Sequence, residues 1–314
     1  MYVGVDLGGT NIKAGLVDDD GKIISSLMIP TEANLGWERV IANIKKVIAN
    51  LLKDGQVNAI GVGVPGPVDF KKGLIREMPA IPGAKNISVA DELKKEFGKP
   101  VFVDNDANNF ALGEVVFGVA KGRRFVVGVT LGTGIGGGIV IDGKLYRGVK
   151  NYAGEVGHMT VVPNGLQCNC GKFGCWEAYG SATALIRNAL SYKKRDIVTR
   201  LREFPDDKID AKTIFELAKD GDEFCNFLVQ NMFFYLGLGI ASLVNVLNPE
   251  MVVIGGGVSL AGNFLIEPVR KIAFDNIMPP LREELEIVLS KFGGNAGMLG
   301  AAGLAKIEFE GLKS

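Results

Sequence analysis

The sequence lacks an excess of charge of either sign. Its 314 residues include 35 basic and 35 acidic side chains, so the formal net charge at pH 7 is zero. A chain without net charge has no extended field to hold nucleic acid or an anionic membrane. We therefore expect neither of these partners, and any anionic ligand must be bound by a local site.

The sequence also lacks a segment typical of export or membrane insertion. It begins with the strand-like run Met1–Val5, without a basic stretch followed by an apolar one. The longest apolar stretch, Phe233–Leu247, is interrupted by Ser242 and Asn245 and falls short of the ~18 residues of a membrane span. We expect a buried core helix there, in a cytoplasmic protein.

Cysteine and histidine are scarce, with four cysteines and a single histidine. Cys168, Cys170 and Cys175 fall within eight positions, whereas Cys225 stands alone in an apolar helical pattern. This spacing argues against a disulfide framework and favours metal binding by the clustered thiols, with Cys225 as a packing residue. A tetrahedral structural zinc needs four ligands, and His158 completes the set.

Length and an internal repeat predict two lobes. A chain of 314 residues that is 47% hydrophobic exceeds the ~250 residues at which single cores stop growing. The run Val5–Asp18 is matched in kind by Val129–Asp142, because each is a strand, a Gly/Thr turn and a second strand. We therefore predict two similar lobes that face each other across a cleft, each with one phosphate-binding turn.

Local patterns place further elements around these turns. Apolar residues from Val40 to Leu52 recur at three- and four-residue spacing, which predicts one buried face of a helix ending near Gly55. Ser88 followed by Asp91 resembles a capping box before a short helix. The other predictions are an antiparallel meander at Tyr2–Asp6, Ile12–Val17 and Lys22–Ile29, buried strands at Ala59–Val64 and Val101–Val103, and a helical segment at Asn295–Lys306 that packs back on the sheet.

Two glycine-rich turns predict phosphate binding. Glycine permits the positive φ angles and the close approach with which several backbone N–H groups converge on a phosphate. One such turn is more often a plain hairpin, but two matched turns favour a ligand. Neither turn fits the Walker A or the Rossmann pattern. The residues predicted to contact phosphates are Gly8, Gly9, Thr10, Asn11 and Lys13 at the first turn and Gly132, Thr133, Gly134 and Gly136 at the second.

Asp6 ends a buried-type strand beside the first turn. Its charge is costly there unless a cation or hydrogen-bond donors meet it. Magnesium uses one or two carboxylates together with substrate phosphates, so we predict that Asp6 binds Mg²⁺ together with the phosphates of a ligand. An ordinary turn acceptor is the alternative for Asp6, and a solvent-facing strand lysine is the alternative for Lys13.

These motifs resemble those of a known fold and family. Val3–Asp18 and Gly128–Gly143 resemble the two phosphate motifs of the ASKHA fold, which actin, hexokinases and sugar kinases share. Leu131–Gly138 and Gly154–His158 resemble the ROK family, named for repressors, unassigned frames and kinases. The resemblance covers nearly the whole chain.

The resemblance implies an α/β fold with two actin-like or hexokinase-like lobes, a duplicated RNase H-like arrangement, and a cleft between the lobes. Leu247–Val258 is similar to the family's adenosine-binding segment, which assigns Gly256 and Gly257 to the nucleotide. We expect a small N-terminal lobe at residues 1–116, a C-terminal helix at about 297–314 that packs back on it, and a large lobe at residues 117–296.

The activity that the resemblance implies is that of an ATP-dependent hexose kinase. Glucose is favoured by the resemblance alone, and fructose, mannose, N-acetylglucosamine and N-acetylmannosamine stay alternatives. In phosphoryl transfer a carboxylate takes the proton of the acceptor hydroxyl. Asn105 and Asp106 resemble the family's sugar-binding pair, with Asp106 as the base. Helix capping is the alternative for this pair, although Asp104 or Asn108 can cap as well.

Three more residues resemble family positions that contact the sugar, namely Glu155, His158 and Glu177. For Glu177 the alternative is a charge at a helix N-terminus after Trp176. His158 followed by C-x-C-G-x-x-G-C resembles zinc-containing ROK proteins. Because C-x-C differs from the common C-x₂-C spacing, the zinc prediction depends on the histidine and on this likeness. Zinc on one ring nitrogen would leave the other aimed at a sugar hydroxyl.

Two alternatives come from other functional classes. ROK repressors carry an N-terminal helix-turn-helix, whereas this chain starts at the first phosphate strand and is neutral, which disfavours DNA binding. An actin-like filament subunit is disfavoured by the zinc motif and by the Asn-Asp pair. From the family resemblance we also expect a homodimer.

Overall fold

The chain forms two compact units in a computed structural model that describes residues 1–78, 81–193, 195 and 197–313. Each unit combines helices with β-strands, in agreement with the predicted α/β class. Each unit is also assembled from separate stretches of chain. The predicted lobes, in contrast, are divided by one boundary after residue 116. The first unit comprises residues 1–128, 138–154 and 290–314, and the second comprises residues 129–137 and 155–289.

The first unit is built on a five-stranded sheet with the order β3-β2-β1-β4-β8. The antiparallel meander is confirmed, and Asp6 on β1 pairs with Lys13 on β2. Strand β4 pairs parallel with both β1 and β8, so their carboxyl ends lie at the same edge of the sheet. The strands are β1 (Tyr2–Leu7), β2 (Asn11–Val17), β3 (Ile23–Pro30), β4 (Ala59–Val64) and β8 (Val101–Asn105).

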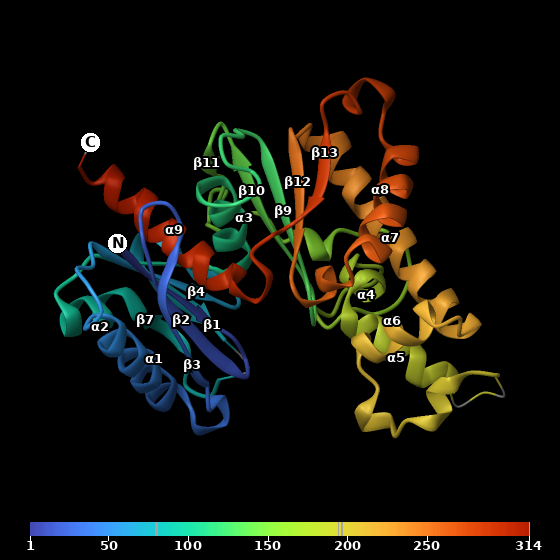
Figure 1. Cartoon of the computed structure of the whole chain (residues 1–314), viewed down its shortest axis with the longest axis horizontal. Coiled ribbons are helices and arrows are strands. Elements are labelled where there is room, and N and C mark those ends of the chain that lie inside the picture. Colours follow the sequence, from blue (N-terminus) through green and yellow to red (C-terminus); the bar gives the residue numbers. More distant parts are fainter. Residues whose placement is uncertain (79–80, 194, 196, 314) are drawn as a thin grey trace. The chain divides into compact units, whose positions relative to one another are not determined.

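Helices cover both faces of this sheet. Helix α1 (Trp37–Leu51) packs its apolar stripe on one face, and α9 (Ala296–Gly311) crosses the other, as Figure 1 shows in blue and red. Glycine lets α9 come close, because a Cβ at Gly4 or Gly61 would overlap a backbone carbonyl of this helix. The predicted C-terminal helix thus packs on the first sheet, and its predicted last residue, 314, lies outside the described residues.

Helix α3 (Asp106–Val116) starts directly after β8, at the predicted strand-to-helix junction. Helix α2 (Val89–Phe97) precedes β8, and Ser88 caps it by accepting from the backbone N–H of Asp91 at 3.4 Å, as predicted. A small antiparallel sheet also belongs to the first unit, with strands β5 (Val68–Asp69), β6 (Leu74–Glu77) and β7 (Lys85–Ser88).

A second five-stranded sheet has the order β11-β10-β9-β12-β13. The repeat of the strand-turn-strand motif is confirmed, because β9 and β10 flank the second glycine turn as β1 and β2 flank the first. Strands β12 and β13 pair in parallel. The strands are β9 (Val126–Leu131), β10 (Ile135–Ile141), β11 (Lys144–Leu145), β12 (Met251–Gly255) and β13 (Glu286–Leu289).

The long helix α7 (Glu223–Leu247) contributes many buried residues to the core of the second unit. It begins ten residues before the apolar stretch Phe233–Leu247 noted in the sequence. By length and composition it is the one helix among the described residues that could cross a membrane, but 61% of its most apolar window is buried inside the protein. Cys225 is fully buried in this helix, as predicted. The neighbouring helices are α4 (Glu177–Gly180), α5 (Ala182–Lys193), α6 (Ala211–Lys219) and α8 (Asn263–Asn276).

Candidate active site

The first glycine turn is closed by its own backbone. The N–H of Gly8 donates to the carbonyl oxygen of Asn11 at 3.0 Å, while Gly9 and Thr10 lie exposed at the tip. Thr31 holds the turn from behind, because its hydroxyl donates to the Gly8 carbonyl at 2.7 Å and its N–H donates to the Thr10 carbonyl at 2.8 Å. Thr31 was not predicted from the sequence, because only the pairing of β2 with β3 brings it to this turn.

Asp6 lies half-buried at the end of β1, opposite Lys13. Burial raises the pKa of Asp6 to about 6, and the positive charge of Lys13 opposes that shift. The Lys13 ammonium donates to the carbonyl oxygen of Gly294 at 2.7 Å, so it does not face solvent freely. Glycine at position 297 leaves room for the Asp6 carboxylate, which a Cβ there would overlap. A carboxylate in this environment gains from a nearby cation, which fits the predicted magnesium.

Asn105 and Asp106 form the N-terminus of α3. The side-chain oxygen of Asn105 accepts from the N–H groups of Ala107 at 2.9 Å and Asn108 at 3.2 Å, so Asn105 is the helix cap. Its amide nitrogen donates to the Gly66 carbonyl at 3.3 Å. The Asp106 carboxylate accepts from the Ala107 N–H at 2.8 Å and is exposed. The structure therefore assigns capping to Asn105 and places the exposed Asp106 at the first position of α3.

The second glycine turn is held by residues of the second unit. The Gly132 N–H donates to the Gly134 carbonyl at 3.0 Å, and the Gly132 carbonyl accepts from Ala182 at 2.9 Å. A third glycine turn, Gly255–Gly257 after β12, packs against it, because Gly256 has φ of 85° and a Cβ there would overlap the backbone of Leu131. The second turn thus lies beside Gly256 of the predicted adenosine-binding segment.

A cavity of about 590 Å³ opens beside these two turns. Gly132, Thr133 and Gly257, all predicted nucleotide contacts, line it. Its other walls come from α5, α6 and the turn after β12, which sequence reasoning did not identify because helix packing brings them together. These additional lining residues are Ala182, Ile186, Asp210, Ala211, Lys212, Phe215, Glu216, Lys219, Val258, Leu260 and Ala261.

The four predicted zinc ligands lie together in the second unit. One ligand atom from each of His158, Cys168, Cys170 and Cys175 lies within 4.8 Å of the other three. Two of the separations are 3.8 Å, from Cys168 Sγ to His158 Nδ1, and 3.6 Å, from Cys170 Sγ to Cys175 Sγ. Sulfur atoms around a tetrahedral zinc with Zn–S of ~2.3 Å lie roughly 3.8 Å apart, so the cluster fits this ion.

The glycines of C-x-C-G-x-x-G-C shape the loop that carries the thiols. Gly171 and Gly174 have φ of 84° and 78°, which L side chains rarely adopt. Between them the chain turns back, so that the Cys168 N–H donates to the Lys172 carbonyl at 2.8 Å. Next to the loop, Trp176 is fully buried and donates to a carbonyl of α7 at 2.7 Å, which ties the cluster to the core.

The thiols have unequal acidity without a metal. Burial raises the pKa of Cys175 to about 12 and also raises the pKa of Cys168. The backbone N–H of Lys172 lowers the pKa of Cys170. Thiols bind zinc as thiolates, so metal binding would displace protons from Cys168 and Cys175 at neutral pH.

The predicted sugar-binding side chains of the second unit surround this cluster. While the Nδ1 atom of His158 faces Cys168, its Nε2 atom lies 4.0 Å from the Glu155 carboxylate, on a partly exposed side. Glu177 accepts from the Ile135 N–H at 3.0 Å through one oxygen, and its other oxygen lies 3.7 Å from Cys168 Sγ. Glu177 therefore contacts both the second glycine turn and the cluster, which the sequence analysis did not foresee.

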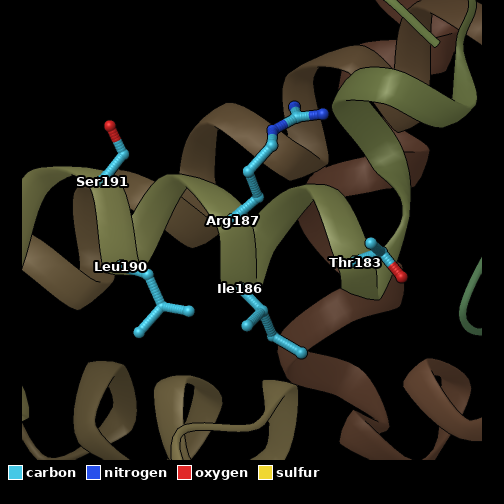
Figure 2. Close-up of a pocket in the computed structure, with 5 residues that line it drawn as sticks. All are labelled: Thr183, Ile186, Arg187, Leu190 and Ser191. Carbon is cyan, nitrogen blue, oxygen red and sulfur yellow. The ribbon is translucent and has the colours of Figure 1, made fainter. Parts of the chain in front are cut away.

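Two further pockets lie near α5. One, of about 160 Å³, includes Thr133, Cys168 and Glu177 in its lining. The other, of about 560 Å³, is lined by the α5 residues of Figure 2, where Ile186 and Leu190 point to the same side of the helix. None of the predicted site residues belongs to this second lining, so we do not include it in the candidate site.

Comparisons with known proteins give one consistent result. The model of the ROK family matches residues 2–308. A glucokinase of Thermotoga maritima is 42% identical over 97% of this chain and 96% of its own length. A ROK family glucokinase of Streptomyces griseus, solved with glucose and AMPPNP, is 37% identical, with a TM-score of 0.85 over 98% of this chain and 99% of its own. A ROK family transcriptional regulator is 28% identical, with a TM-score of 0.88 over 99% of this chain and 79% of its own.

Proposed function

The chain belongs to the ROK family, and on this premise we propose that it is an ATP-dependent glucokinase, which transfers the γ-phosphoryl group of Mg-ATP to the 6-hydroxyl of glucose. The observation that carries the proposal is the exposed Asp106 carboxylate, held at the N-terminus of α3 beside the capping residue Asn105. The two-lobed hexokinase-like fold of its structural relatives agrees with this activity.

In the proposed reaction Asp106 accepts the proton of the attacking hydroxyl. Such a base contributes about 10²- to 10⁴-fold to the rate in typical enzymes. The Asn105 amide nitrogen supplies a donor for a neighbouring hydroxyl. Phosphoryl transfer has a loose transition state, so the protein mainly orients the two substrates and neutralises charge.

The nucleotide contacts that we propose follow the glycine turns. The second and third turns hold the triphosphate and the adenosine, whose base and ribose occupy the 590 Å³ cavity beside Phe215 and Val258. Asp6 and the first turn hold the magnesium ion and the terminal phosphates of the Mg-ATP substrate. Backbone N–H groups and threonine hydroxyls are the donors that such phosphates require.

We also propose that His158, Cys168, Cys170 and Cys175 hold a structural zinc ion. Four protein ligands leave no open position on the metal, so its role is to order the loop. The imidazole of His158 is then fixed through Nδ1, and its Nε2 is available to a sugar hydroxyl beside Glu155. Glu177 accepts a hydrogen bond from a further hydroxyl of the sugar. It also contacts the second glycine turn.

The test of the function is an ADP-release assay with wild-type protein over a panel of hexoses, with the product identified by ³¹P NMR. The proposal expects glucose to be converted to glucose 6-phosphate with the highest kcat/KM of the panel. Preference for mannose, fructose or an N-acetylhexosamine would keep the reaction and reassign the substrate. Absence of ADP release with every hexose would overturn the kinase proposal.

A sugar-responsive regulator is the second candidate, because a ROK family transcriptional regulator shares this fold. Regulation without phosphoryl transfer does not need the exposed carboxylate of Asp106 or the magnesium-binding Asp6. We therefore favour the enzyme. We further propose a homodimer, which light scattering coupled to size exclusion would test directly.

A further inference from the structure

A largely buried ion pair holds the end of β8, just before the proposed base in the sequence. Asp104, the residue two positions before Asp106, is 3% exposed at its side chain and binds Arg147, which is 16% exposed. The Arg147 Nε atom donates to the Asp104 carboxylate at 2.7 Å. Both residues belong to the first unit, although 43 positions separate them in the sequence. No prediction from the sequence gave either residue this role.

The Asp104 carboxylate organises the turn that presents the base. Its other oxygen accepts from the backbone N–H of Asn105 at 2.8 Å and from the Asn108 side-chain amide at 3.0 Å. The Asn105 side chain in turn caps α3 through the N–H groups of Ala107 and Asn108. The contacts of one buried carboxylate thus fix the backbone on both sides of the Asp106 side chain.

Arg147 is itself held on three sides. Its guanidinium lies 3.5 Å above the ring centroid of Phe70, and its Nη2 atom contacts Glu308 of α9 at 3.3 Å. A planar guanidinium can stack on a ring and donate from its edge at the same time, which an ammonium cannot do. These contacts fix the orientation of the guanidinium. Arg147 therefore supplies a positive charge to Asp104 and also sets the position of its carboxylate.

We propose that Arg147 is a positioning residue for the phosphoryl transfer: through Asp104 it holds the Asn105–Asp106 turn in the arrangement that receives the acceptor hydroxyl. The inference rests on the proposed function of Asp106. Removing Arg147 leaves Asp104 as a buried carboxylate without its counter-charge, and the turn then relaxes toward other hydrogen-bond partners. A displacement of ~1 Å at a reacting group costs on the order of 10²-fold in rate.

Kinetics of Arg147→Ala and Arg147→Lys test this role. We expect Arg147→Ala to lower kcat per folded molecule ~10- to 100-fold and to raise the KM for the hexose, with the KM for Mg-ATP within ~2-fold of wild type. Arg147→Lys restores the charge but not the stacking, so it should recover part of the lost kcat. The control is Glu308→Gln, which removes the charge from the longer of the two carboxylate contacts and should leave kcat within ~2-fold.

Hydrogen exchange gives a readout that does not depend on the reaction. The capped N–H groups of Ala107 and Asn108 should exchange faster in both Arg147 variants than in wild type, while those of α2 should keep their protection. If the wild-type protein phosphorylates no hexose, the proposed function is wrong. The exchange experiment would still test whether Arg147 holds the Asn105–Asp106 turn through Asp104.

Three outcomes would overturn the inference. One is an Arg147→Ala protein whose kcat and hexose KM match those of wild type once corrected for the folded fraction. Another is a KM for Mg-ATP that rises as much as the KM for the hexose, because that pattern indicates a general loss of structure. If Arg147→Ala does not fold, Arg147→Lys decides alone, and a wild-type kcat together with unchanged exchange at Ala107 would contradict the proposal.

Discussion

Glu177 accepts a hydrogen bond of 3.0 Å from the backbone N–H of Ile135, at the end of the second glycine turn. Its second oxygen lies 3.7 Å from the sulfur of Cys168. One carboxylate thus joins a predicted phosphate-binding turn to the predicted zinc cluster inside the second unit. If the proposed substrate contacts are right, the loop that carries the cluster affects nucleotide binding as well as sugar binding.

Removing zinc should weaken the binding of both substrates. Loss of the proposed metal frees the Cys168 loop and so releases His158 and Glu177. The loss of one or two hydrogen bonds of about 1 kcal/mol each corresponds to roughly 5- to 30-fold weaker binding. Calorimetric titration of glucose and of an ATP analogue measures the two affinities. The titrations are made before and after a thiol-reactive mercurial and a chelator have removed the metal. Affinities that stay unchanged in protein shown by elemental analysis to be free of zinc would contradict the account.

Gly134→Ala should damage the second turn. A Cβ at this position would overlap the Glu177 carboxylate, whereas a Cβ at Gly132 would meet no atom within 4 Å. The carboxylate is the movable end of a flexible side chain, so the main cost of displacing it is the loss of its hydrogen bond to the Ile135 N–H, about 0.5–1.5 kcal/mol. We expect Gly134→Ala to lower the free energy of unfolding in urea by about 1 kcal/mol.

Gly132→Ala is the matched control for that experiment, because it makes the same chemical change two positions away in the same turn. Its free energy of unfolding should stay within about 0.5 kcal/mol of the wild-type value, as for substitutions that make no clash. Equal destabilisation by the two variants would show that the contact with Glu177 is not what requires glycine at position 134.

Asp6 should make the use of Mg-ATP dependent on pH. Burial raises the pKa of this carboxyl to about 6, so in the free enzyme it is ionised at pH 7 and becomes protonated as the pH falls through 6. A protonated Asp6 cannot attract a cation, and kcat/KM reports the pKa values of the free enzyme. We therefore expect kcat/KM for Mg-ATP to fall about tenfold per pH unit well below pH 6, provided that a single proton is responsible.

The matching variant is Asp6→Asn. Its kcat/KM for Mg-ATP should not show the fall below pH 6, because the amide does not titrate. Its kcat/KM at pH 8 should be lower than that of wild type, since the charge that meets the magnesium ion is gone. A variant that keeps the wild-type fall below pH 6 would show that another group causes it, and the pH profile of kcat/KM decides between the two.

The sequence was enough to predict the local elements around the site. The meander, the capping residue Ser88 and the strand-to-helix junction at Asp106 depend on neighbouring residues, so spacing and turn chemistry predict them. The four predicted zinc ligands lie between His158 and Cys175, a short stretch of chain, which is why their clustering could be predicted.

Contacts made across the fold could not be predicted in this way. Thr31 reaches the Gly8 turn through the pairing of β2 with β3, and Arg147 reaches Asp104 from the segment after β11. Phe215 and Val258 line one cavity only because helices and turns of the second unit pack together. Strand register and helix packing depend on the whole chain, whereas periodicity reports on one element at a time.

The most direct test of the account is the rate of glucose phosphorylation by Asp106→Asn, measured with Asp91→Asn, a carboxylate in the first turn of α2, as the control. If Asp106 takes the proton of the acceptor hydroxyl, kcat of its variant falls about 10²- to 10⁴-fold, with glucose still bound and the control near wild type. An Asp106→Asn protein with kcat within about threefold of wild type, well under the range for a general base, would contradict the account.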